Sequence, residues 1–187
     1  LHLSIRRQRQ MCIRDRRGLA YTRDFVSTLY GSAREAVAQG MDLAACERFY
    51  REVLGFADTD YMHFHFSPDA KDPGQGLHFM HVDNPRHHSL ALFQSKDPMP
   101  GDLVHLMVEV PDLDTLGGFM DRVHSNGVRV ITCLGRHTND RMVSIYVETP
   151  AGFALEYGFD GLQLDWSSYV PTFSKRESHW GHRWGQG

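Results

Sequence analysis

The sequence predicts an α+β protein in which two copies of a strand–helix–three-strand (βαβββ) unit form one curved mixed sheet around a central pocket. The first observation is a repeated helix signal, because an Asp begins and a Gly ends each of two amphipathic stretches, 42–55 and 112–127. A shift of the chain by 70 residues superposes Asp42 on Asp112, Phe49 on Phe119 and Val53 on Val123. The second observation is that strands with one apolar and one polar face accompany each helix.

The first helix is expected to begin after Asp42 as its cap and to end at Gly55. Its apolar residues recur at helical spacing: Leu43, Cys46, Phe49, Tyr50, Val53 and Leu54. Three strands are expected to follow, around 61–66, 77–82 and 88–93. In the second unit, we expect a strand at 104–110 before the helix and a strand at 128–133 after it.

A hairpin at 142–157 completes the second unit and has the most informative polar pattern. Its first strand alternates two sets of residues: Met142, Ser144, Tyr146 and Glu148 with Val143, Ile145 and Val147. Pro150 and Gly152 predict a turn, after which the chain returns antiparallel. With a loop of about three residues, Tyr146 and Glu156 lie nearly opposite each other and share a face, which suggests a pocket. The alternative is a solvated Glu156 and a Tyr146 that only packs.

Composition favours a metal site over a nucleic-acid or membrane-binding surface. The chain has 187 residues, of which 41% are hydrophobic and 23% charged, as in ordinary globular domains. It has no apolar run near the ~18 residues of a membrane-spanning helix. Its three cysteines are unclustered, which argues for a reducing, cytoplasmic compartment and against a cysteine-based zinc site. Its twelve histidines are the outlier, and histidine is the commonest metal ligand.

The first 17 residues differ in charge from the rest of the chain. They carry a net +5, which leaves −8 for the remainder of a chain whose total is −3. A basic arm for nucleic acid, an Arg-rich transit peptide and sequence foreign to the protein are the alternatives, and we favour the last. We therefore expect a non-native or disordered leader at 1–31 and one domain at 32–161, with units at about 32–103 and 104–161. An aromatic tail at 162–187 is expected to pack on that domain.

Five motifs together carry a family resemblance: HVDNPRHHSLAL, LVHLMVEV, LGRHTND, MVSIYVETPAGFALEYG and SHWGHR. In this order they resemble the catalytic half of the type I extradiol ring-cleaving dioxygenases, which belong to the vicinal oxygen chelate superfamily. The 2,3-dihydroxybiphenyl 1,2-dioxygenase group is the most similar. The resemblance covers Asp42 to about Arg183, and members normally carry a further N-terminal domain of the same paired design, which this sequence lacks.

The resemblance implies a non-haem Fe(II) held by two histidines and one carboxylate, with open positions for a catechol and O₂. It assigns the second His ligand to His105 and the carboxylate to Glu156. It implies the following further roles: His88 as the base that also stabilises oxygen, His137 and Tyr146 in substrate binding or proton transfer, and Asn139 and Asp140 in ordering their loop.

The sequence departs from the family at the first His ligand. The 70-residue shift pairs His105 with Glu35, where that ligand is expected. The segment 32–39 is predicted to be a capped helix, so we expect the opening strand to be absent and the first unit incomplete. A reading-frame error or splice before Asp42 would explain both the lost strand and the basic leader. Glu35 as a true ligand is the alternative, and a solvated Glu35 is the interpretation that we favour.

Three functional hypotheses follow from these observations. The leading one is an extradiol dioxygenase that acts with Fe(II) and O₂ on a bicyclic or polycyclic catechol in aromatic or steroid catabolism, impaired by the lost His ligand. The second is a metal-dependent lyase or isomerase on the same scaffold. The third is an inactive fragment or a metal-poor module that binds a small molecule. The resemblance also implies a homo-oligomer, and we expect neither nucleic acid nor a membrane as a partner.

Overall fold

The computed structural model describes residues 26–31, 43–65, 69, 71, 74–94 and 103–185. In chain order its elements are β1 (Val26–Gly31), α3 (Leu43–Leu54), β2 (Ala57–Phe64), β3 (Gln75–His81), β4 (Leu90–Gln94), β5 (Leu103–Glu109), α4 (Leu113–Ser125), β6 (Val130–His137), β7 (Val143–Glu148), β8 (Ala154–Phe159), β9 (Thr172–Ser174) and β10 (Ser178–Trp180). No helix among these residues is long and apolar enough to cross a membrane.

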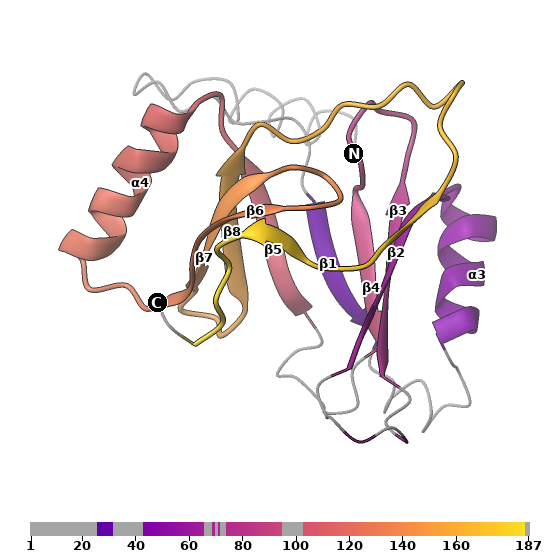
Figure 1. Ribbon diagram of the computed structural model, residues 1–187, viewed down its shortest axis with the longest axis horizontal. Helices are drawn as coiled ribbons and strands as arrows, with labels where there is room; N and C mark the ends of the chain where they lie inside the picture. The colour runs from indigo at the N-terminus through magenta and orange to yellow at the C-terminus, as the bar shows by residue number, and fades with distance from the viewer. Residues whose placement is uncertain are drawn as a thin grey trace, which may run out of the picture.

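The strands form one mixed sheet in the order β10-β6-β7-β8-β5-β1-β4-β3-β2-β9. In each half, the opening strand pairs in parallel with the last strand of its unit, β1 with β4 and β5 with β8. The two halves meet where β1 and β5 pair antiparallel. The sheet is strongly curved, with one helix outside each half (Figure 1). The predicted duplication of a βαβββ unit is therefore confirmed.

The opening strand of the first unit corrects the prediction that this unit is incomplete. The structure places β1 at Val26–Gly31, within the segment expected to be a leader. Its backbone pairs on both sides, with β4 and with β5, so the fold supplies partners for its N–H and C=O groups. Such long-range pairing selects a strand that local alternation did not reveal. The segment predicted as a helix at 32–39, with Glu35, lies outside the described residues.

Both predicted helices are confirmed. Asp112 caps α4, because its Oδ1 accepts a hydrogen bond of 2.7 Å from the backbone N–H of Thr115. Gly127 follows that helix with a φ of 60°, and Gly55 follows α3 with a φ of 75°. These left-handed conformations explain why a glycine ends each helix. The cap expected at Asp42 lies outside the described residues.

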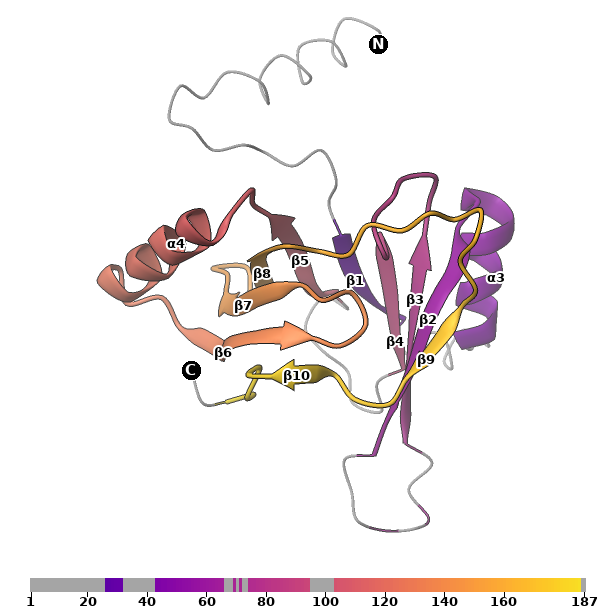
Figure 2. The same ribbon diagram turned by 45° about the horizontal axis from the view of Figure 1, so that its top comes forward.

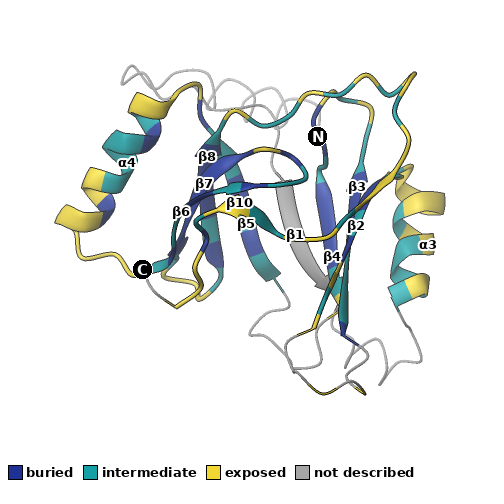
Figure 3. Ribbon diagram, in the orientation of Figure 1, coloured by how far each residue is buried: buried dark blue, intermediate teal, exposed yellow. Residues whose placement is uncertain are grey.

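Each helix packs on the outer face of its own half of the sheet. Leu116 of α4 is fully buried in a cluster with Ile145 and Tyr157 of the sheet. On the other half, partly buried Leu43 and Tyr50 of α3 pack against a cluster that contains fully buried Met80, Leu90 and Leu92. In β4 and β7 successive residues are buried, so both faces of these strands are covered (Figure 3). Two apolar clusters therefore lie under the helices, while a third, around Met62 and Phe79, forms part of the lining of the concave side.

Leu116→Ala is expected to destabilise the fold by about 3 kcal/mol, because it removes a fully buried leucine from a packed cluster. Leu113→Ala, on the same helix but 55% exposed, is the matched control and is expected to change stability by under about 0.5 kcal/mol. Urea unfolding measures both free energies. Equal losses in the two variants would contradict the assignment of the inner helix face.

The C-terminal tail supplies both edge strands of the sheet. β9 pairs in parallel with β2, and β10 pairs antiparallel with β6. The tail thus runs from the outer edge of one half to the outer edge of the other (Figure 2). Its Trp166 stacks on His81 with ring centroids 3.4 Å apart, whereas Trp180 and Trp184 are about half exposed. Strand pairing, which the sequence did not predict, therefore anchors the tail together with Trp166.

Candidate active site

The concave side of the sheet holds a cavity of about 480 Å³. The strands of the first unit give it an apolar wall: Met62, Phe64, Leu77, Phe79 and Phe93. The second unit contributes polar residues: His105, His137, Asn139, Asp140, Tyr146 and Glu156. His88 lines the cavity too. Apart from Glu35, all seven site residues that the sequence predicted therefore lie around this cavity. The size and the aromatic wall suit a small aromatic molecule.

His105 and Glu156 form the centre of the polar wall. They lie on the neighbouring strands β5 and β8, where Glu156 is in register with Met107, two residues beyond His105. His105 Nε2 is 3.2 Å from Glu156 Oε2, and both residues are buried. An imidazole nitrogen and a carboxylate oxygen so close together in a buried site are a donor pair for a divalent metal ion.

Glu156 is held as a carboxylate by its neighbours. Burial alone raises the pKa of this carboxyl, but the hydrogen bonds and charges of His105 and His137 outweigh burial and hold the pKa well below its usual range. Its Oε1 accepts a hydrogen bond of 2.6 Å from Ser144 Oγ and lies 3.3 Å from His137 Nε2. The cavity therefore contains a buried negative charge at neutral pH.

Tyr146 lies directly opposite Glu156 in the β7–β8 pair, as the hairpin pattern predicted. Its hydroxyl is 2.9 Å from His137 Nε2. Burial lowers the pKa of His137, but the hydrogen bond with Glu156 and the nearby negative charges together raise it to about 9. Burial, together with the charge of Glu156, raises the pKa of Tyr146 well above its usual value. His137 and Tyr146 thus both hold a proton at neutral pH, at the side of the carboxylate.

His88 lies just before β4 and also lines the cavity. Its Nδ1 is 3.9 Å from Asp140 Oδ2, and its ring meets Phe79 edge-on with centroids 4.8 Å apart. Burial, with the nearby charge of His87, lowers the pKa of His88 well below its usual value. The ring is therefore neutral at pH 7, the state in which a histidine can accept a proton.

Asn139 and Asp140 order the turn between β6 and β7. Asn139 Oδ1 accepts a hydrogen bond of 2.9 Å from the backbone N–H of Asp140. Asp140 Oδ1 accepts one of 3.0 Å from the N–H of Met142, and Arg141 between them has a φ of 60°. These local bonds stabilise the left-handed residue, as Asx turns do. Asn139 and Asp140 thus form the hydrogen bonds that residues ordering a loop would form.

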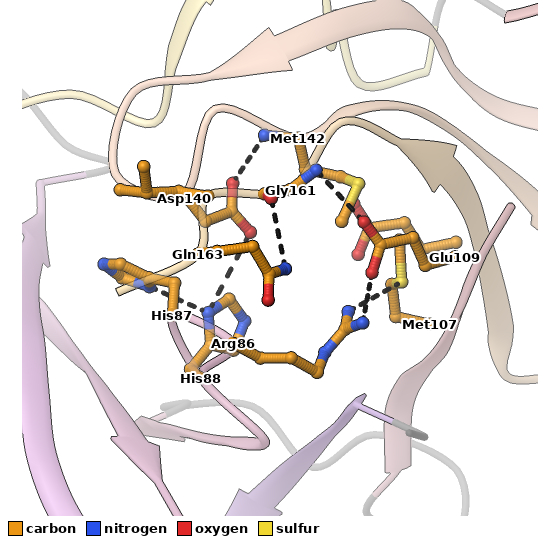
Figure 4. Close-up of a pocket in the computed structure, with 11 residues that line it drawn as sticks. Arg86, His87, His88, Met107, Glu109, Asp140, Met142, Gly161 and Gln163 are labelled. Carbon is orange, nitrogen blue, oxygen red and sulfur yellow. Dashed lines mark hydrogen bonds and ion pairs between the residues drawn. The ribbon is translucent and has the colours of Figure 1, made fainter. Parts of the chain in front are cut away.

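A small pocket of about 20 Å³ lies beside the cavity and has room for about one water molecule (Figure 4). Arg86 and Glu109 form a largely buried ion pair on one side of it. Glu109 Oε1 also accepts a hydrogen bond of 3.1 Å from the N–H of Gly161. This network ties the loop after β8 to β5.

Sequence reasoning missed Ser144 and His182. His182 comes from the tail and is buried, with its Nε2 3.2 Å from Ser144 Oγ and 3.1 Å from the carbonyl oxygen of Ser144. Its Nδ1 is 2.8 Å from the Ser178 hydroxyl. The SHWGHR motif contains both Ser178 and His182, and the alternation of β7 put Ser144 on the face of Tyr146. Only the docked tail shows that they meet behind Glu156.

Glycines make room for His182 at this position. A Cβ on Gly135 would lie 2.5 Å from the His182 ring, and one on Gly181 would lie 2.1 Å from the carbonyl oxygen of Leu134. His182 itself has a φ of 46°, which a residue other than glycine seldom adopts. The close approach of the tail to β6 therefore needs glycine at both positions.

Ser144→Ala is expected to destabilise the metal-free protein by about 1–3 kcal/mol, because it removes a donor from a buried carboxylate. Ser125→Ala is the control, since that hydroxyl donates to the Asp121 carbonyl on an exposed helix face, and we expect a change within about 0.5 kcal/mol. Urea unfolding at neutral pH measures both. A neutral result for Ser144→Ala would show that the hydroxyl does not support Glu156.

Two further histidines, His78 and His81, lie away from the donor pair. His78 is buried on the helix side, with its Nδ1 2.7 Å from Glu47 of α3 and its Nε2 3.2 Å from Asp58. His81 stacks on Trp166. Neither lines the cavity. They hold α3 and the tail against the sheet and do not replace the missing ligand.

His105 and Glu156 are the kinds of ligand that bind iron, but the described residues supply only two of the three ligands expected. His105 and Glu156 supply imidazole and carboxylate, two of the three groups in a 2-His-1-carboxylate set. The adjacent strand β1, VSTLYG, contains no His, Asp or Glu. Among the residues that the structure describes, no group of three potential ligands could hold a metal ion. Glu35 lies outside those residues, so the third ligand stays unassigned.

Comparison with known proteins agrees with this geometry. Residues 34–157 match the Glyoxalase/Bleomycin resistance protein/Dioxygenase superfamily. An "Iron-dependent extradiol dioxygenase" of Rhodococcus jostii (strain RHA1) is 39% identical over 166 residues, which cover 87% of this chain and 54% of the relative. A "Biphenyl-2,3-diol 1,2-dioxygenase" of Paraburkholderia xenovorans (strain LB400) is 41% identical over 135 residues, covering 72% and 43%. The chain thus spans about half the length of these relatives.

Solved structures show the same similarity. A 2,2',3-trihydroxybiphenyl 1,2-dioxygenase from Sphingomonas wittichii strain RW1 superposes with a TM-score of 0.71 at 28% identity, covering 87% of this chain and 53% of that one. The halotolerant catechol dioxygenase BphC gives 0.66 at 35% identity, with coverages of 85% and 47%.

Proposed function

The chain belongs to the Glyoxalase/Bleomycin resistance protein/Dioxygenase superfamily, and we propose that it is an extradiol dioxygenase acting on a bicyclic or polycyclic catechol of the 2,3-dihydroxybiphenyl type. One observation carries the proposal. The buried pair of His105 and ionised Glu156 lies in a cavity of about 480 Å³ whose opposite wall is aromatic. A small-molecule site of this kind offers a metal at one end and an apolar space for a second ring at the other.

His105 and Glu156 would hold Fe(II), the oxidation state that this chemistry requires. When bound, the ion would supply a chelation point for the two catechol oxygens and for O₂. The buried carboxylate of Glu156 would offset the positive charge of the ion. Ser144 and His182 keep Glu156 oriented through the hydrogen bonds described above.

The chain's own residues would move the protons. His88 is neutral and lines the cavity, so it would accept a proton from a catechol hydroxyl at its ring nitrogen. His137 holds a proton at neutral pH beside the Tyr146 hydroxyl, so this pair would return a proton to oxygen as the ring opens. Base and acid thus come from different halves of the fold.

The apolar wall would orient the substrate. Phe79 packs against His88, and Met62 and Phe64 extend the wall away from the donor pair. A ring attached to the catechol would lie along this surface and exclude water. We expect the protein to act in the cytoplasm as a homo-oligomer in aromatic or steroid catabolism, with catechol and O₂ as its partners and without nucleic acid or membrane.

Anaerobic loading with Fe(II), followed by 2,3-dihydroxybiphenyl and oxygen, tests the proposal. A coloured ring-opened product that requires iron is the supporting result. Glu156→Gln is expected to abolish product formation, because it removes the carboxylate ligand. His179→Ala, at an exposed position on β10, is the matched control and should change neither iron content nor product.

A second candidate function is a metal-poor module that binds a small molecule. The observation that favours it is the donor set, because the described residues provide only two ligands. Aromatic binding without iron retention or product would support it. Iron retention without ring cleavage would instead favour a metal-dependent lyase or isomerase on the same scaffold.

A further inference from the structure

His87 and His88 are consecutive residues whose side chains meet through like nitrogens. His87 Nδ1 is 3.0 Å from His88 Nδ1, and the two rings are nearly perpendicular at 86° (Figure 4). His87 is buried, and its backbone N–H donates to the carbonyl oxygen of Leu162 at 3.3 Å. Its ring packs edge-on against Phe79 and Tyr169. The side chain is therefore fixed in this contact.

The contact couples the tautomers of the two rings. A neutral imidazole carries one N–H and one unprotonated nitrogen. Burial lowers the pKa of both histidines, so both rings are neutral at pH 7. In a hydrogen bond between two Nδ1 atoms, one ring must donate and the other must accept. The donor ring then has an unprotonated Nε2, and the acceptor ring has an Nε2–H.

Asp140 decides which ring donates. Its Oδ2 lies 3.9 Å from His88 Nδ1, while its Oδ1 already accepts the N–H of Met142. An ionised carboxylate only accepts hydrogen bonds, so it favours a proton on the nitrogen that faces it. A proton on His88 Nδ1 can form the hydrogen bond to His87 Nδ1 and also lies near the Asp140 charge, whereas a lone pair there would face that negative charge.

We propose that His87 is a positioning residue, which accepts the Nδ1–H of His88 and so holds Nε2 of His88 unprotonated. This tautomer leaves the ring nitrogen that is remote from Asp140 as the base. This inference rests on the proposed function at one point only, which is that the proton accepted by Nε2 comes from a catechol hydroxyl. The identity of the neighbouring hydrogen bond sets a histidine tautomer in catalytic and metal sites alike.

Nitrogen NMR of the metal-free, ¹⁵N-histidine-labelled full chain tests this proposal without any catalytic measurement. Two-bond and three-bond ¹H–¹⁵N correlations separate protonated from unprotonated ring nitrogens, and His88→Gln identifies the His88 signals by their loss. We expect a protonated Nδ1 and an unprotonated Nε2 in His88. An unprotonated Nδ1 in the unmodified chain would overturn the proposal, whatever the variants do.

The variants separate His87 from Asp140 as the cause. His87→Phe is expected to shift the His88 pattern toward an Nε2–H or a mixture, and His87→Asn to restore it, because the amide oxygen can take the place of the acceptor nitrogen. Tyr169→Phe, beside His87 but distant from His88, is the control and should leave the pattern unchanged. A pattern that changes in Asp140→Asn but not in His87→Phe would refute the role of His87.

These outcomes are distinguishable from failure of the proposed function. The tautomer is measured without iron, oxygen or catechol, so an inactive chain can still show the predicted pattern. Conversely, ring cleavage by a chain whose His88 has an Nε2–H would leave the dioxygenase proposal intact and remove only the role of His87.

Discussion

Thr28→His is expected to raise the Fe(II) affinity of this chain by about 10-fold or more. Residues that only hydrogen-bond to a metal ligand typically change metal affinity by about that factor, and a direct ligand should have at least the same effect. The backbone of β1 runs antiparallel to β5 with position 28 opposite His105. Side chains directly opposite each other in an antiparallel pair share a face. From this register, we expect a histidine introduced there to complete a 2-His-1-carboxylate set with His105 and Glu156.

Two variants control this experiment. Ser27→His introduces the same side chain on the neighbouring residue, which projects to the opposite face of the strand. Glu35→His tests the position that the sequence repeat indicates, four residues beyond the end of β1. Iron retained after anaerobic dialysis, with Co(II) titration as a second measurement, is expected to rise in Thr28→His alone. An equal rise in Ser27→His would contradict the register of β1.

His88→Ala is expected to lower ring cleavage by about 100-fold or more while leaving iron content unchanged. The reason is that the proposed function gives His88 a role in proton transfer and not in holding the metal. The substitution is made in the Thr28→His background, where iron retention can be measured beside turnover. His179→Ala serves again as the exposed control. Loss of iron in His88→Ala would show that His88 is a ligand and would refute its role as a base.

Local sequence determined the helices and most of the strands. Asp112 and the two glycines after the helices act within one turn of the chain, so the caps follow from neighbouring residues. The opposition of Tyr146 and Glu156 is also local, because the period of two and a short turn fix the register of one hairpin. These features depend on contacts between residues close in sequence, which is why the sequence predicts them.

The tertiary structure alone decided the identity of the opening strand and the supports of the carboxylate. β1 is selected by pairing with β4 and β5, more than sixty residues away along the chain, and no local pattern encodes that choice. Ser144 and His182 meet behind Glu156 only because the tail crosses the molecule and pairs with β6. Side-chain alternation specifies a face of a strand, but the partner on that face is fixed by packing between segments distant in sequence.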